Sequence, residues 1–101
     1  MLTSTQRAQL RGLAATEDTI VHIGKGGITD NIITQMSDAL KARELVKGRV
    51  LENSLLTARE ACDQLAGVCR AEPVQVIGSK FVLYKRNEQK PKIELVKKEK
   101  K

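Results

Sequence analysis

Residues 19–51 read TIVHIGKGGITDNIITQMSDALKARELVKGRVL. The β-branched run at 19–23 predicts a strand, and the apolar run at 45–51 predicts a second one. Between them lies a predicted helix that has Thr29 as its N-cap and ends near Glu44. Its inward stripe comprises Ile32, Ile33, Met36, Ala39, Leu40 and Arg43. A strand–helix–strand unit of this kind favours two parallel strands joined by a crossover helix.

Further elements flank this unit on both sides. Residues 3–15 and 57–69 show helical spacing, and residues 74–77 and 81–85 are predicted strands joined by a short turn. Capping boxes pair Thr3 with Gln6 and Thr57 with Glu60. The order α-β-α-β-α-β-β predicts an α/β domain: a compact, small mixed four-stranded sheet covered by helices, with the last two strands forming an antiparallel hairpin.

The chain has 101 residues, enough for one domain. We expect the domain to span residues 1–86 and a basic tail to span 87–101, with a short edge segment near 92–96. No apolar run approaches the ~20 residues needed to cross a bilayer, and the N-terminus lacks the apolar core of a signal peptide. We therefore expect a cytoplasmic protein. Nothing in the sequence demands more than a monomer, which is the state we expect.

The positive charge is concentrated at the C-terminus. Residues 85–101 hold eight basic and three acidic residues, a net charge of +5, whereas the first 84 residues hold ten and nine, a net charge of +1. A basic tail suits a polyanion such as nucleic acid, or an acidic membrane surface. The alternative is a tail that only keeps the protein soluble.

The sequence offers no recognisable catalytic or metal-binding set. Cys62 and Cys69 would lie about 10 Å apart along one helix, beyond the ~7 Å that a disulfide allows between Cα atoms, and are interpreted as core residues. His22, in an apolar run, is interpreted as structural. We expect neither enzymatic activity, nor a cofactor, nor a metal. With only Phe81 and Tyr84 as aromatics, binding built on several stacking rings is excluded.

The segment most suggestive of binding is the glycine-rich loop Gly24-Lys25-Gly26-Gly27, which links a strand to a helix. Glycines allow close backbone approach, and the N–H groups at a helix start favour an anion. The nucleotide P-loop and the dinucleotide fingerprint are not matched. The G-x-x-G form fits, as in KH domains, which clamp a nucleic-acid backbone. The alternative is an ordinary turn.

Lys47 and Arg49 lie two apart on one predicted strand and therefore point the same way. Next to the glycine loop they would extend a positive strip. The alternative is that both are ordinary solvent-facing strand residues.

Several separated blocks of the sequence resemble the bacterial YhbY family, the single-domain form of the CRM (chloroplast RNA splicing and ribosome maturation) domain. The resemblance spans roughly residues 2 to 96. Its carriers are Leu2-Thr3, Gln6-Arg7, Leu10-Arg11, Leu13-Ala14, Ile23-Gly24-Lys25-Gly26-Gly27-Ile28-Thr29, Glu44-Leu45-Val46-Lys47, Val74-Gln75-Val76-Ile77-Gly78 and Leu83-Tyr84.

The resemblance implies a fold similar to the C-terminal domain of a bacterial translation initiation factor, with a KH-like loop. It also implies RNA binding and association with precursors of the large ribosomal subunit. The glycine-rich loop, the two basic residues of the second strand and the family resemblance together give the candidate RNA-binding residues. These are Gly24, Lys25, Gly26, Gly27, Thr29, Lys47, Arg49, Arg7, Arg11, Lys85 and Arg86.

Two positions depart from the family pattern. Lys85-Arg86 follows Tyr84 where the family often has Arg directly, and the two side chains are not equivalent in bidentate contacts. Gly48 replaces a β-branched residue between Lys47 and Arg49, which predicts a weakened strand, a bulge or a close approach.

Two functions remain open on the sequence. The leading hypothesis is an RNA-binding protein that associates with large-subunit rRNA or its precursor particles and assists ribosome assembly, with ribosomal proteins as possible neighbours. The alternative is a protein–protein docking module on the assembling ribosome, whose basic tail supplies only non-specific attraction to RNA. A nucleotide-processing enzyme has no supporting residues.

Overall fold

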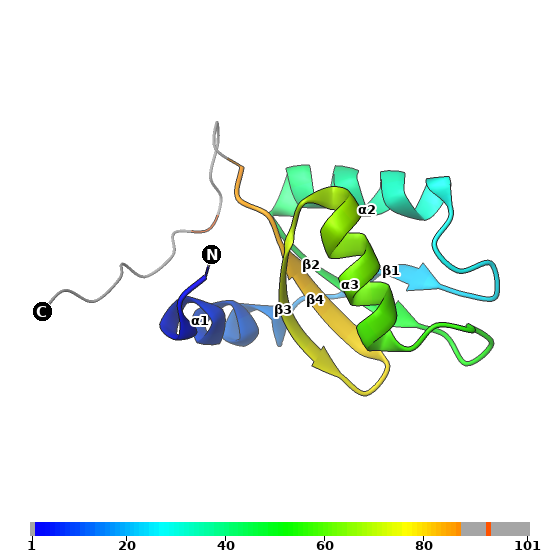
Figure 1. Cartoon of the computed structure of the whole chain (residues 1–101). Coiled ribbons are helices and arrows are strands. Elements are labelled where there is room, and N and C mark those ends of the chain that lie inside the picture. The colour runs from blue at the N-terminus through cyan, green and yellow to red at the C-terminus, as the bar shows by residue number, and fades with distance from the viewer. Residues whose placement is uncertain (1, 88–92, 94–101) are drawn as a thin grey trace, which may run out of the picture.

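A computed structural model of the chain describes residues 2–87 and 93. It confirms the predicted order of elements and the α/β class (Figure 1). The elements are α1 Ser4–Ala14, β1 Thr19–Ile23, α2 Asp30–Arg43, β2 Leu45–Val50, α3 Ala58–Cys69, β3 Glu72–Ile77 and β4 Lys80–Tyr84. Among the described residues, no helix is both long and apolar enough to cross a membrane.

Local hydrogen bonds start the helices where the sequence predicts. The capping boxes of Thr3 with Gln6 and of Thr57 with Glu60 are both present. The Thr29 hydroxyl accepts a hydrogen bond from the N–H of Ile32 at 3.3 Å. Each cap satisfies N–H groups that the first turn of a helix leaves without intrahelical partners.

The four strands form one mixed sheet in the order β1-β2-β4-β3. β1 and β2 are parallel, as the strand–helix–strand unit predicts, and β4 pairs antiparallel with both β2 and β3. β3 begins at Glu72, earlier than the prediction of Val74, and so includes Pro73. The sheet accepts this proline because β3 is an edge strand with an irregularity beside it.

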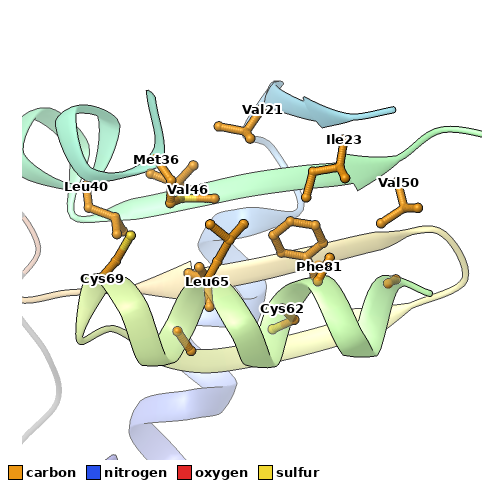
Figure 2. Close-up of a cluster of buried hydrophobic side chains, with 14 residues drawn as sticks. Val21, Ile23, Met36, Leu40, Val46, Val50, Cys62, Leu65, Cys69 and Phe81 are labelled. Carbon is orange, nitrogen blue, oxygen red and sulfur yellow. The ribbon is translucent and has the colours of Figure 1, made fainter. Parts of the chain in front are cut away.

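The main core lies between the sheet and the pair α2 and α3 (Figure 2). Leu65 and both cysteines of α3 face this core, as predicted, and both thiols are free and buried. Val46 and Val50 of β2 join them from the sheet. The alternation along β2 therefore sends Lys47 and Arg49 to the opposite face.

That opposite face is covered by α1 over only part of its area. Leu10 and Ala14 of α1 pack with sheet residues in a second cluster. The sheet contributes Leu45, Val74, Val82 and Tyr84 to it. Toward the ends of β1 and β2, the side chains on this face are exposed or half-buried. We call this uncovered part the open sheet face, made of His22, Lys47, Arg49, Gln75, Ile77 and Lys80.

Two residues differ from their predicted surroundings. Arg43 does not continue the inward stripe of α2, because its side chain is exposed and lies 3.7 Å from a carboxylate oxygen of Glu17. His22 is exposed on the open sheet face although it sits in an apolar run, because Val21 and Ile23 on either side take the two inward positions of β1.

Gly48 is explained by the ring of Phe81. The two residues are directly paired between β2 and β4, and the ring lies over the glycine. A Cβ atom at position 48 would lie 2.7 Å from Cε1 of Phe81 and closer still to Cζ. Of the three outcomes that the sequence leaves open here, the structure shows the close approach.

Glu44 is a fully buried carboxylate at the C-cap of α2, with a positive φ of 66°. The carboxylate accepts hydrogen bonds from the N–H of Asn87 at 2.6 Å and of Ile93 at 2.7 Å. Its backbone carbonyl accepts from the N–H of Lys85. Buried charge is tolerated where such donors surround it. Glu44 thus attaches Asn87 and Ile93 to the domain, and Ile93 packs against the second cluster.

The expected short edge segment is only partly within the described residues. Ile93 is described and lies outside any strand, whereas the rest of 92–96 lies outside the described residues. The proposed division into a domain at 1–86 and a tail at 87–101 stays a prediction.

Replacing Gly48 with Ala should destabilise the protein by about 1–3 kcal/mol, because the new methyl group overpacks against the Phe81 ring. The matched control is Gly67→Ala on α3, where a Cβ meets nothing within 4 Å. Removing that helical glycine should stabilise by up to about 1 kcal/mol. Urea unfolding measures both. Equal effects at the two positions would contradict the packing argument.

Replacing Glu44 with Ala should destabilise the fold by about 1–3 kcal/mol, because two partly buried N–H groups lose a charged acceptor. Hydrogen exchange at the amides of Asn87 and Ile93 should accelerate. Glu52→Ala, at an exposed loop position, is the control and should change stability by less than about 0.5 kcal/mol. Unchanged exchange at Asn87 and Ile93 would show that Glu44 does not hold this segment.

Candidate nucleic-acid interface

The glycine-rich loop forms a tight turn directly after β1. The N–H of Gly27 donates to the carbonyl of Gly24 at 3.0 Å, which leaves Lys25 and Gly26 exposed at the tip. Gly27 has a φ of +72°, a conformation that favours glycine. A Cβ on Gly26 would make only an ordinary contact, 3.7 Å from Thr29. The turn itself therefore demands glycine at position 27, and the tip is open to another molecule.

The tip of the turn combines a cation with backbone donors. Within the part of the chain that the structure describes, the N–H groups of Lys25 and Gly26 donate no hydrogen bond. Thr29 caps α2 with its hydroxyl, and Asp30 places a negative charge in the first turn. The carboxylate of Asp30 opposes an anion at the helix start, so the tip is the better place for a phosphate.

The loop at 51–57, which joins β2 to α3, lies beside the glycine turn. The two loops are neighbours because β1 and β2 are parallel and end at the same edge of the sheet (Figure 1). A Cβ on Gly24 would lie 3.6 Å from Oδ1 of Asn53, and one on Gly27 would lie 4.0 Å from Leu56. Between them in sequence, Leu55 is 89% exposed. The sequence reasoning did not single out Leu55, which offers an apolar contact beside the glycine turn.

The open sheet face carries a row of basic side chains across three strands. We call it the basic row, and it consists of His22 of β1, Lys47 and Arg49 of β2, and Lys80 of β4. Arg49 of β2 is paired with His22 of β1 on one side and with Lys80 of β4 on the other. Lys47 lies two residues before Arg49 on the same face. The prediction that Lys47 and Arg49 share a face is confirmed. Lys80 was missed because it was assigned to the turn, whereas the register of the hairpin brings it beside Arg49.

A groove of about 290 Å³ runs between α1 and the open sheet face. We call it the α1 groove. Its polar lining consists of Arg11, Lys47, Lys80 and Gln75, and its apolar lining includes Ala14, Val82 and Ile77. The structure thus brings Arg11 of the first helix together with Lys47 of the second strand, two positions far apart in sequence. Among the described residues, no carboxylate lines this groove.

Arg7 lies apart from Arg11, in a cavity of about 280 Å³ along β3. Arg59 of α3 lines the same cavity, and Gln75 lines both this cavity and the α1 groove. Among the described residues, the buried Nε of Arg7 has no hydrogen-bond partner. Arg59 was not a candidate from the sequence, since only the packing of α3 against β3 brings it to this edge.

Lys85 and Arg86 lie at the other end of the sheet from Lys80. They follow Tyr84, which is paired with Leu45 at the start of β2, whereas Lys80 is paired with Arg49 near its end. Five residues of strand separate Lys85 from Lys80 by about 17 Å. The structure therefore does not bring Lys85 and Arg86 to the glycine turn or to the basic row.

The thiols and the phenol lie in the protein interior. Burial raises the pKa of Cys62 to about 11, with the neighbouring Asp63 adding to the shift. Burial also raises the pKa values of Cys69 and Tyr84. Among the described residues, no three His, Cys, Asp or Glu side chains are grouped to hold a metal ion. The glycine turn and the open sheet face offer cationic side chains and backbone N–H groups, which suit anion binding.

Comparison with known proteins agrees with this arrangement. The CRS1 / YhbY (CRM) domain family matches residues 2–85. The chain belongs to this family. The match includes the glycine turn, the basic row and both arginines of α1, so the resemblance expected from the sequence is confirmed.

Two bacterial relatives match over nearly their whole length. The chain is 41% identical over 95 residues to "Probable RNA-binding protein YqeI" of Bacillus subtilis, covering 94% of this chain and 99% of that protein. It is 31% identical over 97 residues to an "RNA-binding protein" of Haemophilus influenzae, covering 96% and 97%. The solution structure of SAV1595 from Staphylococcus aureus is similar, with a TM-score of 0.79 and 45% identity, covering 95% of this chain and 100% of that one.

Proposed function

We propose that this protein binds RNA, with the exposed glycine turn and the basic row on the open sheet face as its contact surface. The observation that carries the proposal is that cationic side chains from two separate elements lie toward the same edge of the sheet. Lys25 at the turn and Arg49 in the row both lie toward the edge where β1 and β2 end. Phosphate contacts of this kind supply most of the affinity of proteins for nucleic acids.

The turn supplies the backbone clamp in this proposal. The N–H groups of Lys25 and Gly26, together with the Lys25 ammonium, contact a phosphate, while Lys47, Arg49 and Lys80 neutralise further ones. Contacts of this kind carry no sequence information. The names of the relatives support RNA as the ligand.

The RNA that we propose is large-subunit rRNA in assembling ribosomal particles in the cytoplasm. The choice of this RNA follows what the resemblance to the CRM family implies, namely association with precursors of the large ribosomal subunit. The protein acts there by binding RNA, without catalysis, and ribosomal proteins are its neighbours on the particle.

A titration of purified large-subunit rRNA at two salt concentrations tests the proposal. Affinity should fall steeply with salt because bound phosphates release counterions. The variant Lys25→Asp with Gly26→Asp should lose about tenfold or more in affinity. Both positions are exposed and neither has a positive φ, so the variant should fold.

The matched control is Lys41→Asp with Gly67→Asp, which makes the same change in net charge at exposed positions on α2 and α3. This control should keep most of the affinity. Equal losses in the two variants would mean that net charge alone drives binding, and binding that does not depend on salt would contradict the backbone clamp.

A docking module is the second candidate, favoured by the near-neutral charge of the first 84 residues and by the exposure of Leu55. In that case the tail alone attracts RNA. Changing Lys97, Lys98, Lys100 and Lys101 to Gln would then abolish RNA binding, whereas the loop variant would leave it unchanged.

A further inference from the structure

We propose that the α1 groove binds one unstacked base of single-stranded RNA, with Gln75 reading the edge of that base. This inference rests on the proposed function, because the strand must first be held by its phosphates. It goes beyond that function by adding a site that recognises a base rather than the backbone.

The lining of the groove is not what a phosphate alone requires. Arg11, Lys47 and Lys80 suit phosphates, but Ala14, Val82 and Ile77 add apolar surface between them. Ile77 is 62% exposed, an apolar side chain left at the surface among cations. A flat base covering Ile77 would remove its exposed side chain from water, while its flanking phosphates reach the cations.

Gln75 supplies a hydrogen-bonding group at the same place. Its side-chain amide carries both donors and an acceptor, the combination that reads base edges. Within the described part of the chain, this amide forms no hydrogen bond to the protein. Gln75 lies on β3 and pairs with Val82 of β4, so the amide sits beside the apolar lining of the groove.

The protein has no Phe, Tyr or Trp ring at its surface on which a base could stack. Phe81 and Tyr84 are its only aromatic residues, and both are buried. Proteins also hold unstacked bases against the plane of an arginine guanidinium, and Arg11 lines the groove. The volume of about 290 Å³ lies at the small end of the range for ligand pockets, which favours one base over a larger ligand.

The groove also has an exit for the strand. Gln75 is shared with the neighbouring cavity that holds Arg7 and Arg59, so the two cavities adjoin. A strand that places a base in the groove can continue toward these two arginines. On the other side lie Arg49 and the end of β1, where the glycine turn begins.

The test compares a short single-stranded RNA of mixed sequence with an abasic strand of the same length, in binding titrations of the full chain. The wild-type protein should bind the base-bearing strand about twofold to tenfold more tightly, the range for one net hydrogen bond to the base edge. Gln75→Leu and Ile77→Ser should each bring this ratio toward one, with little change in affinity for the abasic strand.

Matched controls make the same changes on the outer face of α3. Gln64→Leu and Val68→Ser, both at exposed positions, should keep the wild-type ratio. Thermal unfolding checks that all four variants fold. A wild-type ratio of one, or a ratio that the groove variants leave unchanged, would overturn the proposal. So would an acidic peptide that displaces the base-bearing strand as well as unlabelled RNA does, because the groove would then bind any anion.

The two proposals fail separately in this design. The affinity for the abasic strand reports the phosphate contacts alone. If the variant Lys25→Asp with Gly26→Asp leaves that affinity unchanged, the proposed clamp fails, whatever the base-dependent ratio shows. If the clamp variant weakens abasic binding and the ratio is one, only the base site fails.

Discussion

The packing of the Phe81 ring over Gly48 is the contact on which the other features of the sheet depend. It occurs at the directly paired positions of β2 and β4, in the middle of the main core. A slip of one residue in this register would put every side chain of β2 on the wrong face. Because the ring packs best over a residue without a Cβ, this contact favours the observed register, and with it the outward direction of Lys47 and Arg49.

The distribution of charge over the surface, more than the net charge, makes the α1 groove suited to an anion. The first 84 residues are almost neutral in total, yet the described residues that line the α1 groove include three cations and no carboxylate. This asymmetry follows from the coverage of the sheet. Two helices bury one face, while α1 covers only part of the other and leaves the rest to basic and polar side chains. Parallel pairing of β1 and β2 then sets the glycine turn at the edge of this surface.

Patterns local in sequence predicted most of the fold, because caps and hydrophobic periodicity depend on near neighbours. Thr3, Thr29 and Thr57 each start a helix as expected. The errors and omissions arise where distant segments meet. Lys80 becomes part of the basic row only through the register of β4 with β2, and Arg59 reaches the edge of β3 only through helix packing. The burial of Glu44 depends on N–H groups more than forty residues away.

RNA binding through the glycine turn and the open sheet face is tested most sharply by an amide chemical-shift map of the full chain titrated with single-stranded RNA. We expect the largest changes on residues 24–27, on Lys47, Arg49 and Lys80, and on Gln75, while the outer face of α3 around Gln64 and Val68 stays unchanged. Changes concentrated on the outer face of α3, or confined to residues after Asn87, would contradict this expectation.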